Sequence, residues 1–253
     1  MLKDPTRLVG LHFFNPVAKM QLVEVVAMAA SDPTAVARAA ALVLAIKRLP
    51  LPVRSSPGFL VNRILMPYLL EAVTLVEEGI APTVIDRAAT DFGMPMGPVR
   101  LADAVGLDIC LSVAGIFARH YATEVPARLE QLVAAGRLGR KSGRGFYEYG
   151  RHHESKAAAV SSLFAAEIGD RLMLRLLNEA VACWREQVTA DAELLDGGVI
   201  FGSGFAPFRG GPLQHIRDAG PEALYAKLGE LAQRHGVRFT PDPGWQELIR
   251  QQR

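Results

Sequence analysis

Residues 10–26 read GLHFFNPVAKMQLVEVV, in which two apolar runs flank a short polar segment that begins with Asn15-Pro16. Both runs are rich in β-branched and aromatic residues, which favours strands, and Asn-Pro favours a turn between them. His12 and Glu24 lie at equal distances from Ala18, near the middle of this turn. If the two strands pair antiparallel, the imidazole and the carboxylate therefore lie opposite each other on one face of the sheet.

A helix and a third strand are predicted after this hairpin. Ser31 or Asp32 can cap the helix, and apolar residues recur at helical spacing over residues 34–48. The segment LPVRSS (51–56) then predicts one more short strand. Residues 1–55 therefore have the strand–helix–strand order of the closing edge of an α/β sheet, although two or three strands are too few to fold alone.

The rest of the sequence predicts an almost entirely α-helical protein. Apolar residues recur at helical spacing from Phe59 to about Glu78, and proline and glycine residues then separate several shorter helices. Residues 136–150 predict a glycine-rich loop, and RHHESK (151–156) is polar enough for a linker. We therefore predict a mainly α fold in three parts: a small α/β segment at 1–55, a helical domain at 56–150 and a second helical domain at 157–253.

The two helical segments resemble each other, which indicates a duplication. Residues 69–98 align with residues 176–207 when one or two single-residue gaps are allowed. Chance similarity between Ala/Leu-rich helices is the alternative, but some of the matches lie in loops. We expect an intrachain pseudo-dimer of helical bundles. The matched positions are Glu71 with Glu179, Asp86 with Asp196, Phe92-Gly93 with Phe201-Gly202, and Pro98 with Pro207.

Composition excludes several classes of function. The 253 residues are 50% apolar and carry 28 basic and 26 acidic residues, so no strongly basic composition indicates nucleic acid or an anionic membrane. The two cysteines, Cys110 and Cys183, lie in apolar helical surroundings, which suits core residues in a reducing compartment. The sequence has no signal peptide and no apolar run of 18 residues, so it predicts a cytoplasmic protein without a membrane span. His152 and His153 lack ligand-type neighbours at a suitable spacing, and no metal is expected.

The expected contact between His12 and Glu24 has a chemical use. A glutamate that accepts from one imidazole nitrogen fixes the tautomer, and the other nitrogen can then take a proton from a substrate hydroxyl. The pair would be a general base. A structural or solvated pair is the alternative, and the spacing by itself favours that alternative.

Four motifs bear on this choice: GLHFFNPVAKMQLVEVV (10–26), SSPGFLVNRILMPYLLEA (55–72), GMPMGPVRLADAVGLD (93–108) and GRKSGRGFYEY (139–149). In this order they resemble the L-3-hydroxyacyl-CoA dehydrogenases of fatty-acid β-oxidation, over about residues 7–150. The segment PFRGGPLQHIRDAG (207–220) resembles the second helical domain of the multifunctional β-oxidation α subunits.

The resemblance implies both a reaction and a set of residues. It implies oxidation of 3-hydroxyacyl-CoA to 3-oxoacyl-CoA with NAD as cofactor. His12 matches the catalytic base of the family, Glu24 its partner carboxylate, and Asn62 an asparagine that donates a hydrogen bond near the reacting centre. Spacing alone gives Asn62 a plainer role, in which a residue near a helix N-terminus bonds local backbone. Residues 1–55 would be the C-terminal remnant of a Rossmann NAD-binding domain.

One family feature is missing from this sequence. A dinucleotide site needs a strand followed by G-x-G-x-x-G at the start of a helix. The nearest match, Gly202 to Pro207, lacks the third glycine and predicts a loop between helices. A serine that relatives place shortly upstream of the histidine is also absent. We therefore expect the chain alone to bind NAD poorly and to need a missing Rossmann or hydratase portion, with a thiolase subunit as a further partner. The alternative function is a non-catalytic helical assembly or acyl-CoA-binding module.

Overall fold

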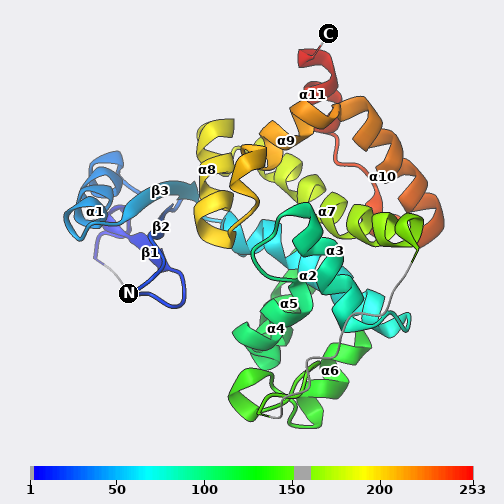
Figure 1. Ribbon diagram of the computed structural model, residues 1–253. Helices are drawn as coiled ribbons and strands as arrows, with labels where there is room; N and C mark the ends of the chain where they lie inside the picture. The colour runs from blue at the N-terminus through cyan, green and yellow to red at the C-terminus, as the bar shows by residue number, and fades with distance from the viewer. Residues whose placement is uncertain (1–2, 151–160, 253) are drawn as a thin grey trace. The chain divides into compact units, whose positions relative to one another are not determined.

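The computed structural model describes residues 3–150 and 161–252 of the chain. They form a mainly α-helical protein with one three-stranded sheet (Figure 1), as the sequence predicts. The predicted linker at 151–156 and the predicted start of the second helical segment near Ala157 lie outside the described residues. The elements are β1 (Val9–Phe13), β2 (Leu22–Ala27), α1 (Pro33–Ala45), β3 (Leu49–Arg54), α2 (Val61–Glu77), α3 (Pro82–Phe92), α4 (Pro98–Val105), α5 (Leu107–Tyr121), α6 (Ala127–Ala134), α7 (Ser162–Arg185), α8 (Ala192–Ser203), α9 (Pro212–Ala219), α10 (Pro221–His235) and α11 (Trp245–Gln251).

The sheet has the order β1-β2-β3, and helix α1 lies against it (Figure 1). Strand β1 is antiparallel to β2, and β2 is parallel to β3. Helix α1 starts as predicted, with the Asp32 carboxylate accepting from the Thr34 amide at 2.7 Å. It ends at Ala45, three residues before the predicted end at Arg48, and Lys47 beyond it has a left-handed backbone (φ 59°).

Strand β2 is buried on both faces. Val23 and Val25, both 0% exposed, pack with apolar side chains of α1. Side chains alternate along a strand, so Leu22, Glu24 and Val26 face the opposite side, and all three are buried as well. A carboxylate in such a strand is costly unless hydrogen-bond donors surround it. The position of Glu24 therefore depends on which groups reach it.

Backbone packing divides the chain into two compact units. Unit 1 comprises Met1–Ile64, Glu179–Tyr225 and Asp242–Arg253, and unit 2 comprises Leu65–Asn178 and Ala226–Pro241. Each unit thus combines pieces from the N-terminal and C-terminal parts of the sequence. Helices α2 and α7 both begin in one unit and end in the other.

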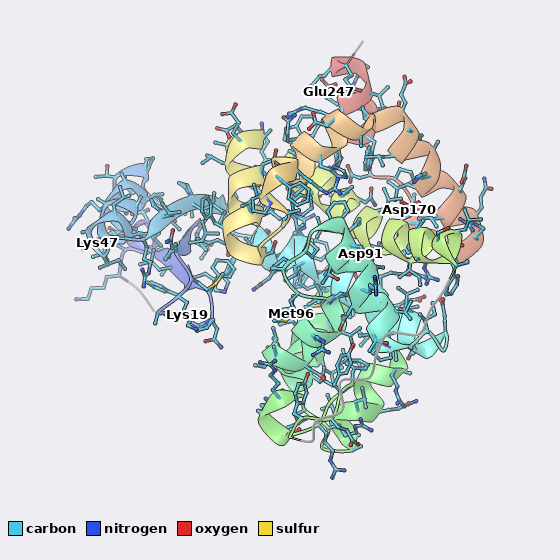
Figure 2. The ribbon with its side chains drawn as sticks, in the orientation of Figure 1. Lys19, Lys47, Asp91, Met96, Asp170 and Glu247 are labelled. Atoms are coloured by element: carbon cyan, nitrogen blue, oxygen red, sulfur yellow. The ribbon has the colours of Figure 1, made fainter. Side chains whose placement is uncertain are left out.

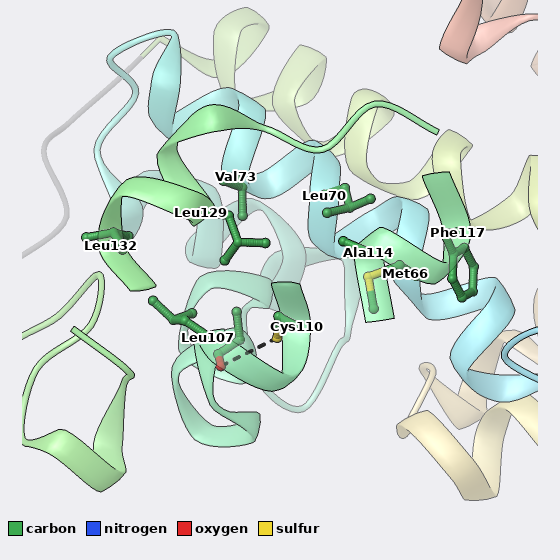
Figure 3. Close-up of a cluster of buried hydrophobic side chains, with 10 residues drawn as sticks. Met66, Leu70, Val73, Leu107, Cys110, Ala114, Phe117, Leu129 and Leu132 are labelled. Atoms are coloured by element: carbon green, nitrogen blue, oxygen red, sulfur yellow. Dashed lines mark hydrogen bonds between the residues drawn. The ribbon is translucent and has the colours of Figure 1, made fainter. Parts of the chain in front are cut away.

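The core of unit 2 is built mainly by helices α2, α5 and α6 (Figure 3). Cys110 lies within it, 4% exposed, with its thiol 3.8 Å from the Ala102 carbonyl oxygen. Burial raises the pKa of this thiol to about 12, so it remains protonated and acts as a small apolar side chain. Cys183 is also a fully buried free thiol, so both cysteines are core residues as predicted. The other side chains of the unit 2 cluster are Met66, Leu70, Val73, Ala102, Leu107, Ala114, Phe117, Leu129 and Leu132.

A buried arginine joins two helices within unit 2. Arg171 of α7 is 3% exposed, and its Nε donates to Glu71 of α2 at 2.7 Å. Its Nη1 and Nη2 donate to Glu78 at 2.6 and 2.7 Å. Glu71 is itself 1% exposed and also accepts from Arg238 at 2.7 Å. The network satisfies charges that would otherwise be buried without partners.

Unit 1 contains a comparable arginine. Arg63, on the first turn of α2, is 2% exposed and donates from Nε to Glu179 at 2.7 Å and from Nη1 to Glu186 at 2.6 Å. Glu179 lies near the C-terminal end of α7, and Glu186 directly follows the helix. The start of α2 is therefore tied to the end of α7.

Two buried aspartates cap later helices. Asp86 accepts from the Val99 amide at 2.8 Å, at the start of α4. Asp196 accepts from the amides of Leu213 and Gln214 at 2.7 and 3.0 Å, at the start of α9. A carboxylate at a helix N-terminus satisfies free amides and interacts favourably with the helix dipole.

The burial of Asp196 predicts a pH dependence of stability. Desolvation raises the pKa of this carboxyl from its usual 3.8 to about 6 in the folded protein. Between these values the folded state binds more protons than the unfolded state, so this contribution to stability is complete below about pH 4 and is lost as the pH rises through 6. We expect the free energy of unfolding of wild type, relative to Asp196→Asn, to fall between pH 4 and 6 by at most about 1.4 kcal/mol per pH unit. Urea denaturation at pH 4, 5, 6 and 7 measures this difference, and a flat difference would contradict the prediction.

Charged side chains of both signs project from the surface. Figure 2 labels Lys19, Lys47, Asp91, Asp170 and Glu247, from both units, as expected from the nearly balanced composition. Within residues 3–150 and 161–252, no single helix is long and apolar enough to cross a membrane, and only the pair α4 and α5, bent by 101°, reaches the necessary length and composition together.

Candidate active site

The β1–β2 hairpin brings a histidine and a glutamate into contact. His12 and Glu24 are direct cross-strand partners, as the symmetric spacing about Ala18 predicts. The His12 Nδ1 lies 2.7 Å from the Glu24 Oε2. The glutamate side chain is fully buried, and the histidine side chain is 28% exposed. One end of the imidazole is therefore fixed inside the protein while the ring remains accessible.

Backbone amides bind the second oxygen of Glu24. The Leu60 and Val61 amides both donate to Oε1 at 3.0 Å. They belong to the N-terminal turn of α2, where amides lack partners within the helix and the helix dipole favours a negative charge. The Glu24 side chain is thus hydrogen-bonded on both oxygens, by amides at a helix N-terminus on Oε1 and by the imidazole on Oε2.

The turn before α2 sets the direction of these amides. Gly58 and Phe59 both have left-handed backbones, with φ of 81° and 52°. The Phe59 amide donates to the Ser56 carbonyl oxygen at 2.9 Å, and the Ser56 hydroxyl donates back to the Phe59 carbonyl oxygen at 3.2 Å. Glycine tolerates this conformation readily, whereas for a phenylalanine it is uncommon. The Pro-Gly-Phe turn therefore has a defined geometry, and it delivers the two amides to Glu24.

Two aromatic rings flank the imidazole. The centroid of the Phe14 ring lies 4.7 Å from that of His12, nearly edge-on at 63°, and the Phe59 ring centroid lies at 5.4 Å. With Nδ1 on Glu24, the ring has little freedom to rotate. Nε2 makes no hydrogen bond to any other described residue, so it is the nitrogen available to an outside group.

Asn62 lies on the same helical turn as the two amides. It follows Val61 directly and is half-buried. Among the described residues its side chain makes no hydrogen bond, either to His12 or to Glu24. The structure thus brings His12 and Glu24 together and places Asn62 on the helix that binds Glu24, without joining its amide to the pair.

The sequence alone does not reveal that the amides of Leu60 and Val61 bind Glu24 or that aromatic rings pack on His12. The available signal was the Pro57-Gly58 pair before a helix, which marks a turn but does not say which carboxylate its amides bind. Phe14, at 8% exposure, is both a core residue and a neighbour of the imidazole.

The described residues do not fit a complete dinucleotide site. Such a site needs backbone amides of a glycine-rich turn at a helix N-terminus. The helix that covers the sheet, α1, begins with Pro33 after the Asp32 carboxylate that caps it, and no glycine-rich turn precedes it. Within residues 3–150 and 161–252, no three or more His, Cys, Asp or Glu residues form a group that could hold a metal ion.

Comparison with known proteins shows which families and relatives this chain is similar to. Residues 1–56 match the model of the 3-hydroxyacyl-CoA dehydrogenase NAD binding domain, and residues 58–149 match that of the C-terminal domain. The fatty acid oxidation complex subunit alpha of Idiomarina loihiensis is 35% identical over 98% of this chain and 37% of that protein. The corresponding subunit of Shewanella frigidimarina is 38% identical over 94% of this chain and 35% of that protein. The chain thus spans little more than a third of the curated relatives it matches.

A solved structure extends the likeness to three dimensions. The 3-hydroxybutyryl-CoA dehydrogenase of Escherichia coli K12 superposes with a TM-score of 0.85 at 26% identity, over 99% of this chain and 72% of that chain. Fold and sequence therefore agree, and this chain belongs to the 3-hydroxyacyl-CoA dehydrogenase family.

Proposed function

We propose that this chain is the proton-transfer part of an NAD-dependent L-3-hydroxyacyl-CoA dehydrogenase of fatty-acid β-oxidation, with His12 as its general base. The observation that carries the proposal is the 2.7 Å contact of His12 Nδ1 with a fully buried carboxylate. This contact fixes the imidazole as the tautomer that is protonated on Nδ1, which leaves a lone pair on Nε2. The family and the relatives' names support the choice of reaction.

The chemistry proposed for the pair is removal of the proton from the 3-hydroxyl group. The His12 Nε2 accepts this proton as the alcohol carbon loses a hydride, and the ring becomes an imidazolium. The Leu60 and Val61 amides hold the Glu24 carboxylate beside the ring, so it stabilises the new positive charge without moving. A positioned general base of this kind contributes about 10²–10⁴-fold to the rate.

Asn62 is proposed to donate a hydrogen bond to the oxygen that becomes the carbonyl. Its place directly after the Glu24-binding amides supports this role, and so does the absence of a hydrogen bond to its side chain within the described part of the chain. An amide donor aimed at this oxygen stabilises the charge that develops on it.

NAD is the proposed hydride acceptor, because residues 1–56 match the NAD-binding domain of the family. The described residues do not provide the pyrophosphate cradle, so the proposal requires an NAD-binding portion from the same polypeptide or from a separate one. The names of the curated relatives support a place in a fatty acid oxidation complex. A hydratase portion and a thiolase subunit would then be further partners, and acyl-CoA the substrate.

We further propose that the helical segments 56–150 and 157–253 are copies of one domain. Arg63 and its two glutamate partners each have a counterpart of the same type 108 residues away in the Arg171 network, which supports the proposal. The helix ends favour a different alignment of the loops from the one that pairs Phe92-Gly93 with Phe201-Gly202 and Pro98 with Pro207. Gly204 is the left-handed cap of α8, as Gly93 is of α3. Pro212 starts α9, as Pro98 starts α4. The pairs related by the offset are Arg63 with Arg171, Glu71 with Glu179, and Glu78 with Glu186.

A reconstituted enzyme tests the proposed function. It joins this chain to the part of the E. coli dehydrogenase that lies outside the structural match, and NADH formation from (S)-3-hydroxybutyryl-CoA is followed by absorbance. We expect turnover from the reconstituted enzyme and little or none from either part alone. If the reconstituted enzyme binds acyl-CoA but forms no NADH, the non-catalytic binding module is the better description.

Replacing Asn62 tests its role as a donor. In the reconstituted enzyme Asn62→Ala is expected to lower kcat by about 10²-fold, the usual effect of losing one donor to a developing oxyanion. Asn178→Ala removes an asparagine that donates to the Thr240 carbonyl oxygen in unit 2, and it should leave kcat unchanged. Equal kcat values for Asn62→Ala and wild type would show that Asn62 does not contact the reacting group.

A further inference from the structure

We propose that helix α8 is a positioning element for the His12–Glu24 pair, an inference that rests on the proposed function. The helix contains Gly197, Gly198 and Gly202 within Ala192–Ser203, although glycine is among the poorest helix formers. Gly202 was expected in a loop, but α8 continues through it to Ser203. Glycines inside a helix often mark close approach of another element. The neighbours of each glycine therefore show whether α8 needs it for close packing.

Gly202 lies directly against the turn that binds Glu24. A Cβ atom at this position would come within 2.6 and 2.9 Å of the two γ carbons of Val61, and within 3.1 Å of Leu22. Val61 is 1% exposed, and its branched side chain has little rotational freedom. A methyl group at Gly202 therefore requires Val61 or α8 to shift, and the Val61 amide is one of the two donors to Glu24.

Gly198 makes a second contact one turn earlier on α8. Its Cβ would come within 2.5 Å of the Leu51 Cδ2 and 3.1 Å of the Leu60 Cδ2. Leu60 supplies the other amide to Glu24, and Leu51 is the cross-strand partner of Glu24 on β3. Both contacts are with the ends of flexible side chains, so they yield more easily than those of Val61.

Gly197 differs from both. No atom lies within 4 Å of the Cβ that would be added there. Two of the three glycines thus face the residues that surround Glu24, and the third does not. This difference within one helix separates a positioning role from a general need for flexibility in α8.

The end of α7 holds the same turn from another direction. Arg63, two residues after Val61, is bound to Glu179 and Glu186. The C-terminal end of β3 is held as well, because the Arg54 amide donates to the Val188 carbonyl oxygen at 2.8 Å. Unit 1 therefore fixes the Glu24-binding turn through α7 and α8, which belong to the second helical segment. In this arrangement that segment contributes to the active site without supplying a group that touches substrate.

The test compares two alanine substitutions on the one helix. In wild-type chain, nitrogen NMR of labelled histidine should show His12 as the Nδ1-protonated tautomer, with a downfield proton shared with Glu24. Gly202→Ala should lose this signal, or reduce it at least twofold, whereas Gly197→Ala should keep it. In the reconstituted enzyme Gly202→Ala should lower kcat about tenfold with little change in KM. The double variant Gly202→Ala/Val61→Ala removes the methyl groups that the new Cβ meets and should restore the tautomer signal.

Several results would overturn the proposal. It fails if a folded Gly202→Ala chain keeps the wild-type His12 signal, or if Gly197→Ala loses it to the same degree. If Gly202→Ala does not fold, Gly198→Ala replaces it, with a smaller change in the same direction expected, and an unchanged signal then refutes the inference. The NMR readout uses the chain alone and needs no cofactor, so absence of NADH from the reconstituted wild type would refute the proposed function and leave this inference standing or falling separately.

Discussion

Replacing His12 with glutamine is expected to lower kcat of the reconstituted enzyme by about 10²–10⁴-fold, the contribution of a positioned general base. Glutamine can still donate to Glu24 and fill most of the space between Phe14 and Phe59, so the fold around the site should persist. It has no nitrogen that can take up the hydroxyl proton. The KM for the acyl-CoA should change little, because the loss is confined to the transition state.

The matched control for this substitution is His120→Gln. His120 is an exposed histidine near the end of α5 in unit 2, and its replacement should leave kcat at the wild-type value. Initial rates over a range of substrate concentrations separate kcat from KM for both variants. If His12→Gln keeps more than a tenth of the wild-type kcat, the imidazole is not the base.

Replacing Arg171 with methionine is expected to lower the free energy of unfolding by about 3–5 kcal/mol, the usual cost of removing one partner from a buried ion pair. The change leaves Glu71, whose side chain is fully buried, with Arg238 as its remaining partner. The midpoint of urea denaturation at pH 7 measures the loss. In the variant Arg171→Met/Glu71→Gln the buried charge of Glu71 is absent as well, so part of the loss should be recovered.

Two comparisons show whether burial of the ion pair causes the loss of stability in Arg171→Met. Arg63→Met should cost less, because its glutamates have side chains that are 22% and 39% exposed and can be rehydrated. Lys227→Met breaks an exposed pair with Asp170 and should cost less than about 1 kcal/mol. Equal losses for Arg171→Met and Lys227→Met would mean that the buried network contributes no more than a surface ion pair.

Much of the hairpin follows from local sequence rules. Equal spacing of His12 and Glu24 about one turn residue predicts their pairing, since antiparallel register follows from the position of the turn. Asp32 predicts the start of α1 for an equally local reason, because its side chain caps the helix two residues away. The mainly α character of the remainder follows from the periodicity of apolar residues.

Features that join distant parts of the chain were not predictable in this way. The amides that hold Glu24 lie 36 and 37 residues further along the sequence, and Arg63 is bound to glutamates 116 and 123 residues away. Alignment with the Phe92-Gly93 turn of the first helical segment predicts a loop at Gly202, whereas Gly202 lies within α8 and packs closely against Val61. The role of Asn62 remains a prediction, because it depends on where the substrate lies.

The two compact units are each made of separate stretches of the chain, and this limits how the protein can be cut into fragments. No break of the chain at a single position separates one unit from the other, because unit 1 takes residues from the beginning, the later part and the end. A protease that cuts once between α6 and α7 would leave two polypeptides that each lack part of both hydrophobic interiors. We expect such fragments to stay associated after the cut, so that nicked and intact protein have the same size under native conditions and differ only after denaturation.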